Sequence, residues 1–131
     1  MEPLQGFVVF LLFTVALLVA TVVTGLTARL KPHLVLVACT VVSLGVAIYY
    51  AEQLGQQYNL DAAGAIKDVH LALAKIATLS YLAPIASGIA TLRNRARKKL
   101  HLVLALTTVA LTVAAAVTGT WMILAAEPLV K

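Results

Sequence analysis

Charged residues are scarce in this chain. They make up 11% of its 131 residues, whereas 62% are hydrophobic and the mean hydropathy is +0.99. Soluble domains carry about 25% charged residues, so this chain has too few to cover a surface that faces water. Lipid, in contrast, contacts apolar helix faces without penalty. The scarcity of charge therefore excludes an ordinary soluble domain and predicts an all-α integral membrane protein.

Cysteine and aromatic residues are also rare. The single cysteine, Cys39, cannot form a disulfide within the chain, and we interpret it as a small packing residue inside an apolar segment. Grooves that bind nucleic acid combine basic residues with aromatics on which bases stack, and the basic loops here contain no aromatic residue. We therefore expect no nucleic-acid partner, although the isoelectric point is about 9.7.

Carboxylates are missing from the centres of the apolar segments. A proton-coupled exporter needs a titratable group within the membrane, and all five acids lie elsewhere: Glu2, Glu52, Asp61, Asp68 and Glu127. The pattern also lacks a converging set of serine, histidine and acid, and a histidine–cysteine cluster with zinc spacing. We therefore predict no catalytic residues and do not expect a hydrolytic enzyme.

Four apolar segments are long enough to cross a bilayer as helices, which requires about 20 residues each. We predict helices at about 7–28, 34–51, 62–92 and 100–126, within a single four-helix transmembrane domain that covers 1–131. Pro32 suits the first turn of a helix, Asp61 is a predicted N-cap, and Pro84 is expected to kink the third helix. Met1-Glu2-Pro3 lacks the positive charge that begins a signal peptide.

The charges divide between the two ends of these segments. The loops after the first and third segments hold Arg29, Lys31, Arg93, Arg95, Arg97, Lys98 and Lys99. The acids lie at the other end, together with Lys67 and Lys131. Short loops rich in Lys and Arg stay cytoplasmic. We therefore predict a protein of the bacterial-type inner or plasma membrane, with both termini on the non-cytoplasmic side.

An internal repeat is the most informative pattern in the chain. Residues 33–47 and 101–115 are identical at seven of fifteen positions, including the opening His-Leu-Val-Leu. The preceding segments also correspond, because Thr24-Gly25-Leu26 matches Ser87-Gly88-Ile89. The repeated unit is a helical hairpin. Two such hairpins predict an up-down four-helix bundle in which the second and fourth helices are diagonal partners.

The repeat places His33 and His101 at the same depth, each two residues after a lysine. Two imidazoles from diagonal helices can hold a haem between them, so we predict both as ligands of haem iron. Gly25 and Gly88 would leave room for the edges of the porphyrin. Arg29 and Arg93 would meet its propionates. Haem b is the expected cofactor, with haem a, copper or no cofactor as the alternatives.

His70 lies at the opposite end of the third segment, away from the other two histidines. The repeat offers it no histidine partner, because Glu2 stands at the matching place. A second bis-histidine site is therefore not predicted, and His70 remains a candidate for a separate metal site. Each histidine also has a structural interpretation, in which a side chain near the membrane surface extends toward the headgroups.

The later segments carry motifs that resemble the CtaM/YozB family of small bacterial membrane proteins. These motifs are His70-Leu71-Ala72, Pro84, the basic loop 93–99, His101, and Thr118-Gly119-Thr120-Trp121, with His33 after a basic residue earlier in the chain. The resemblance covers about three quarters of the sequence. In place of aromatics that the family often carries before Thr-Gly, this chain has TVAAAV at 112–117. The resemblance implies a role in cytochrome oxidase maturation or haem handling.

Two functions follow as hypotheses. The first is a small b-type cytochrome or haem-handling assembly factor, with membrane lipid around it and respiratory oxidase subunits or a redox partner beside it. The second is an accessory or assembly subunit of a respiratory membrane complex that has no cofactor of its own. The sequence does not indicate an oligomeric state.

Overall fold

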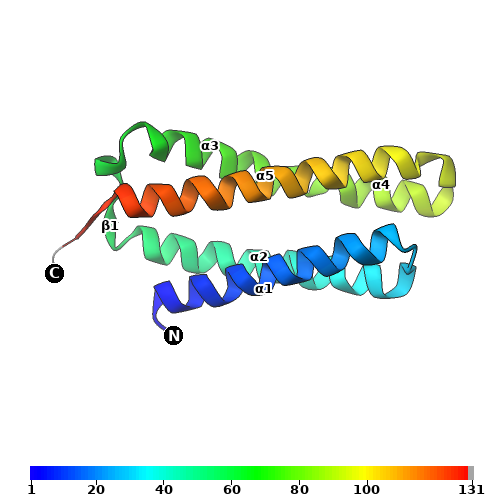
Figure 1. The fold of residues 1–131 in the computed structure, drawn as a ribbon, viewed down its shortest axis with the longest axis horizontal. Helices are drawn as coiled ribbons and strands as arrows, with labels where there is room; N and C mark the ends of the chain where they lie inside the picture. Colours follow the sequence, from blue (N-terminus) through cyan, green and yellow to red (C-terminus); the bar gives the residue numbers. More distant parts are fainter. Residues whose placement is uncertain (130–131) are drawn as a thin grey trace. The chain divides into compact units, whose positions relative to one another are not determined.

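A computed structural model describes residues 1–129 of the chain. These residues form two compact units, and the chain passes from the first to the second between Tyr58 and Asn59. Figure 1 shows that each unit is built from long helices that run antiparallel to each other. Four helices are long and apolar enough to cross a membrane: Pro3–Leu26, Leu30–Gly55, Ala65–Arg93 and Arg95–Ala125. The composition and the helix lengths therefore agree on a membrane protein.

The first unit is the pair α1 (Pro3–Leu26) and α2 (Leu30–Gly55). Both helices are longer than predicted, and α2 begins before the expected 34. Pro32 is nevertheless in its first turn, where the missing N–H costs no hydrogen bond. The connection is short because Ala28 adopts a left-handed backbone with φ of 55°. The Arg29 amide then reaches back to the Thr24 carbonyl at 2.9 Å, which closes a Schellman-type helix end.

Hydroxyl groups line the contact between α1 and α2. Thr14 and Ser43 are hydrogen-bonded at 2.7 Å, and Thr21 and Thr40 at 3.1 Å. The protein interior is in this respect more polar than its surface. The described residues have five buried polar side chains and four buried apolar ones, while Leu, Val and Phe side chains cover the outside. Membrane helices associate in this way, because lipid offers no hydrophobic gain for burying Leu or Val and leaves packing and hydrogen bonds to hold helices together.

The second unit contains the remaining elements. They are the 3₁₀ turn η1 (Leu60–Ala63), α3 (Ala65–Ser80), α4 (Leu82–Arg93), the 3₁₀ turn η2 (Arg95–Arg97), α5 (Lys98–Ala125) and the short strand β2 (Glu127–Pro128). β2 pairs with β1 (Tyr58–Asn59) in a two-stranded sheet. Helix α5 packs against both α3 and α4, so the broken pair α3–α4 acts as one span beside α5.

The predicted cap at Asp61 is wrong. Asp61 lies inside η1, where its amide donates a hydrogen bond to the side chain of Asn59, and α3 starts only at Ala65. Gly64 separates the two elements with φ of 62°, a backbone conformation that favours glycine. Asp61 is instead bound by Lys67. This ion pair and its hydrogen bond hold the pKa of the Asp61 carboxyl below its ordinary value.

Pro84 interrupts the third span as predicted. A hydroxyl group on α5 binds the carbonyl that the proline leaves without its usual helical hydrogen bond. Proline has no N–H to donate to the carbonyl four residues earlier, which is that of Ser80. The helix breaks at Tyr81, and the Ser80 carbonyl accepts a hydrogen bond from the Thr108 hydroxyl at 3.1 Å. Thr108 is 3% exposed. The carbonyl that Pro84 cannot bind therefore has a partner on α5.

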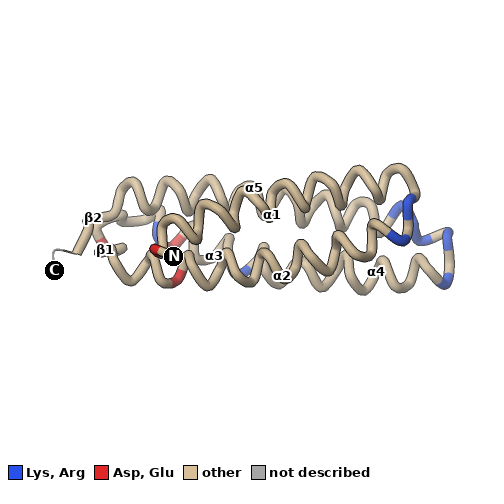
Figure 2. Tube along the Cα trace, turned by 90° about the horizontal axis from the view of Figure 1, so that it is seen from below, with Lys and Arg blue, Asp and Glu red and all other residues tan. Residues whose placement is uncertain are grey.

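Charge is distributed unevenly along each unit. In Figure 2 the lysines and arginines concentrate at the turn of each helical pair, and the acids lie toward the other end of their own unit. The turn residues are Arg29 and Lys31 in the first unit, and Arg93, Arg95, Arg97, Lys98 and Lys99 in the second. Lys131, which the sequence places at the acidic end, lies outside the described residues.

Candidate histidine sites

His33 packs against α1 through the gap left by Gly25. A Cβ atom added at Gly25 would lie 3.0 Å from Cε1 and 3.2 Å from Nδ1 of the His33 ring. The same ring edge is hydrogen-bonded, because His33 Nδ1 lies 2.9 Å from the carbonyl oxygen of Thr21. Thr24 Oγ1 is more distant from Nδ1, at 3.5 Å. Glycine therefore admits the ring, and the main chain of α1 fixes its orientation.

His101 repeats this arrangement in the second unit. A Cβ atom at Gly88 would lie 3.2 Å from Cε1 and 3.5 Å from Nδ1 of His101. The hydrogen-bond partner of Nδ1 is a side chain, because Ser87 Oγ lies 3.1 Å away. Ser87 is 9% exposed. The two histidines that the repeat matched in sequence thus make matched contacts inside their own units.

His70 makes the same kind of contact, although the repeat predicts no partner for it. A Cβ atom at Gly119 would come within 2.7 Å of Cε1 and 3.2 Å of Nδ1 of the His70 ring. His70 Nδ1 lies 3.3 Å from Thr118 Oγ1. The signal was present in the sequence, since Thr118-Gly119 has the same small-polar and glycine pattern as Ser87-Gly88. It identifies the partner only once the register of α3 against α5 is known.

The hydrogen bond to Thr21 defines which nitrogen of the His33 ring carries the proton. A carbonyl oxygen only accepts, so His33 Nδ1 must donate to Thr21. The Ser87 hydroxyl gives its proton to the Pro84 carbonyl at 3.3 Å, and Thr118 gives its proton to the Ala114 carbonyl at 2.8 Å. Each hydroxyl oxygen also lies within hydrogen-bond distance of the facing histidine Nδ1, at 3.1 Å from that of His101 and 3.3 Å from that of His70. The carbonyl contact fixes the tautomer of His33, whose neutral imidazole is protonated at Nδ1.

Gly25 and Gly88 have contacts different from those expected. The repeat predicts room beside these glycines for the edges of a porphyrin, and in the structure the imidazole rings of the same units lie there. At the acidic end of the first unit Gly6 has the equivalent role, because its missing Cβ makes room for the ring of Tyr50. Admission of a ring by a glycine on the facing helix is thus a general feature of both units.

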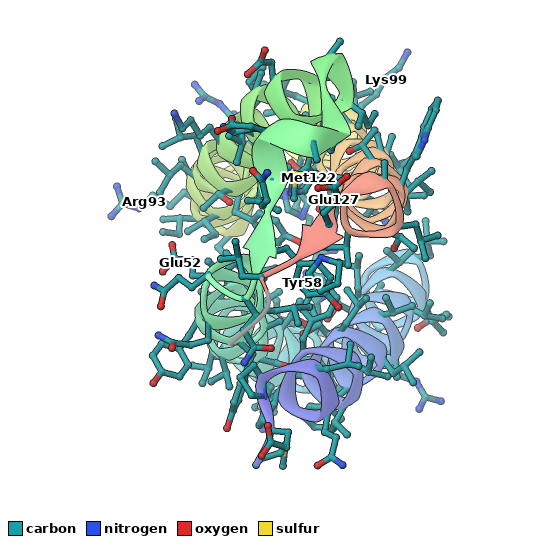
Figure 3. All side chains as sticks on the ribbon, turned by 90° about the vertical axis from the view of Figure 1, so that its left-hand side faces the viewer. Glu52, Tyr58, Arg93, Lys99, Met122 and Glu127 are labelled. Carbon is teal, nitrogen blue, oxygen red and sulfur yellow. The ribbon has the colours of Figure 1, made fainter. Side chains whose placement is uncertain are left out.

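The two arginines that we predicted to bind haem propionates are both exposed. Arg29 is the residue before α2, and Arg93 ends α4, where a cation is favoured by the helix dipole. Arg93 also lines a shallow groove of about 350 Å³ with Ala86, Ile89, Ala90, Asn94 and Arg97. Figure 3 shows the Arg93 and Lys99 side chains extending away from the helices of the second unit. These side chains are accessible to an anionic group.

Met122 is buried, whereas Cys39, which we predicted as a packing residue, is exposed. Met122 is 6% exposed and is turned into the second unit (Figure 3). Cys39 lies on an exposed face of α2. Among residues 1–129 no three side chains of His, Cys, Asp or Glu are grouped so that they could hold a metal ion.

Comparisons with known proteins provide no relative. No protein family, no curated protein and no solved structure matches this chain. The resemblance to the CtaM/YozB family therefore rests on the motifs in the sequence alone.

Proposed function

We propose that this chain is a haem-binding integral membrane protein, with His33 and His101 as the axial ligands of one haem b. The observation that supports it is that each of these histidines has a hydrogen bond at its own Nδ1 atom. A histidine that ligates a metal usually donates its other ring N–H to an acceptor, which fixes the tautomer and the ring plane. Thr21 O provides this acceptor for His33 and Ser87 Oγ provides it for His101.

The proposal requires one ligand from each unit on the same iron. We accordingly propose that the units assemble as an up-down bundle of two repeated hairpins, with α2 and α5 as diagonal partners. The internal repeat supports this arrangement, since it places both histidines just after a basic turn. Arg29 and Arg93 would bind the propionates, and the basic turns would face the cytoplasm. Bound haem would supply one-electron redox chemistry, for electron transfer or for oxidase maturation.

A second function is favoured by a different observation. All three rings, including that of His70, pack against glycines within their own unit, and such packing stabilises a hairpin without any cofactor. An accessory or assembly subunit of a respiratory complex, with no cofactor of its own, would need nothing more. The two proposals differ in whether His33 and His101 have a role that His70 lacks.

The deciding experiment is absorption spectroscopy of the protein purified in detergent after expression with ample haem. Oxidised and reduced spectra should show a low-spin, six-coordinate haem. His33→Ala and His101→Ala should each abolish or convert this spectrum. His70→Ala is the matched control, because it removes the same ring and the same kind of glycine contact, and it should leave the spectrum intact. Colourless protein would refute the haem proposal and favour the accessory subunit.

A further inference from the structure

A groove at the basic end of the second unit combines positive charge with an apolar wall. Its volume is about 350 Å³, and it is lined by Ala86, Ile89, Ala90, Arg93, Asn94 and Arg97. The first three of these residues belong to α4 and form the apolar wall. The two arginines belong to the end of α4 and to the turn η2. The groove therefore has an apolar part along the helix and a cationic part at the turn.

The backbone of the turn brings Arg97 back to the end of α4. Asn94 leaves the helix in an extended conformation, with φ of −142° and ψ of 104°. Its amide bonds to the Ala90 carbonyl at 3.0 Å, and its carbonyl accepts the Arg97 amide at 3.1 Å. Its side chain accepts the amide of Ala96 at 3.0 Å. Because these bonds hold the turn, Arg93 and Arg97 line one groove although they belong to different elements.

The charge around the groove is of one sign. The segment 93–99 holds five cations, and the sequence has no acid between 69 and 126. All five cations are exposed: Arg93, Arg95, Arg97, Lys98 and Lys99. The acids of the second unit lie toward its other end (Figure 2). An anion that enters the groove would therefore meet positive charge with no acid of the same unit nearby.

We propose that this groove binds one anionic phospholipid, whose phosphate meets Arg93 and Arg97 and whose acyl chain lies along the apolar wall. Arginine binds phosphate through two parallel N–H bonds, and basic pockets at the cytoplasmic end of membrane helices bind anionic headgroups. The span Ala65–Arg93 is long and apolar enough to cross a membrane, so its end would lie where headgroups meet acyl chains. A free anion would have no use for the apolar wall.

This proposal does not depend on haem. Arg93 would also bind a propionate under the proposed function, so the tests change Arg97, to which the haem proposal gives no role.

Titration of phosphatidylglycerol into the full chain, purified in a neutral detergent, tests the site, with bound lipid counted by native mass spectrometry. Phosphatidylcholine, which has no net charge, should bind more weakly. Arg97→Lys keeps the charge but loses the two-pronged contact, so affinity for phosphatidylglycerol should fall about tenfold, as expected for the loss of one charge-assisted hydrogen bond. Arg95→Lys is the matched control, because Arg95 lies in the same turn but does not line the groove. Its affinity should equal that of the wild type.

A second pair of variants tests the apolar wall without changing any charge. Ala86 is exposed and lines the groove, so the larger side chain in Ala86→Leu should occupy the path of the acyl chain and weaken phosphatidylglycerol binding. Ala110→Leu is the control, since Ala110 is an exposed alanine of α5 outside the groove, and it should bind as the wild type does.

Two results would overturn the proposal. Equal affinities of Arg97→Lys and Arg95→Lys would show that lipid is attracted only by the diffuse positive charge of the turn. Displacement of phosphatidylglycerol by an equal concentration of inorganic phosphate would show a site for free anions instead of a lipid. Neither result bears on the haem spectra, which test the proposed function separately.

Discussion

At the scale of residues, the chain presents its three imidazoles in one way. Each ring enters a gap left by a glycine on the facing helix and has its Nδ1 within hydrogen-bond distance of a nearby oxygen. The repeat in the sequence was sufficient to pair His33 with His101 as a matched set. It could not assign a partner to His70, because that contact depends on which turn of α5 faces α3. Apolar segments that are hydrophobic all round carry no periodicity from which this register could be read.

Two glycine substitutions test the contact at His70. In Gly119→Ala the new methyl group meets a ring that Thr118 holds in place, so the second unit should lose about 1–3 kcal/mol of stability. Gly45→Ala is the matched control, since nothing lies within 4 Å of a Cβ there, and it should add about 0.5–1 kcal/mol. Unfolding in mixed micelles with a denaturing detergent measures both changes. Equal stability of the two variants would show that the ring is not held against α5.

At the scale of elements, the sequence was sufficient to predict that the helices exist, but it predicted the residues at which they begin and end less well. Pro84 was expected to disturb the third span because it lacks an N–H, and the helix does break next to it. The hydroxyl of Thr108, which satisfies the carbonyl left over, could not be predicted, because it belongs to another helix. Asp61 was assigned as a cap from residue type alone. The short 3₁₀ turn that Asn59 caps instead depends on a local competition between two similar side chains.

The turn between α1 and α2 carries strain that a substitution can release. Ala28 has φ of 55°, which costs a residue with a Cβ about 1 kcal/mol. Ala28→Gly should therefore stabilise the first unit by about that amount. Ala16→Gly, within α1, should destabilise it by about 0.8–1 kcal/mol. The same detergent unfolding assay would measure both, and a destabilised Ala28→Gly variant would contradict the left-handed turn.

The ion pair at the start of the second unit gives a pH dependence with a defined sign. Lys67 lowers the pKa of Asp61, so the pair contributes stability above the ordinary carboxyl pKa, and this contribution is lost as the pH falls through the lowered value. NMR titration should place Asp61 below its ordinary pKa in the wild type. In Lys67→Ala the value should move upward, toward that of an isolated aspartate. An unchanged value would argue against the pair.

At the scale of the whole molecule, the low charge and the lengths of the apolar segments were sufficient to predict four helices that are long and apolar enough to cross a membrane. Composition does not predict how the two units assemble or which cofactor binds, because both depend on contacts between a few side chains that the average hydropathy does not encode. The histidine pair, the repeat and the basic turns support the haem proposal, and the spectra described above are its test.

Orientation can be tested directly by cysteine labelling. In a Cys39→Ala background, a cysteine at Gln56 should react with a membrane-impermeant thiol reagent in whole cells, because the acidic end is predicted to face outward. A cysteine at Ala96, within the basic turn η2, should react only after the cells are opened. The reverse pattern would invert the proposed topology and place the histidines near basic turns on the outer side.

The hydroxyl contacts inside the first unit have a consequence for biosynthesis. Thr14, Thr40 and Ser43, its buried polar side chains, find their hydrogen-bond partners within residues 1–58. A hairpin that satisfies its own polar groups can leave the insertion machinery as a finished pair while the later segments are still being translated. His33 would then be oriented in the bilayer before His101 has been synthesised, so the first half of the chain would serve as a template that the second half joins.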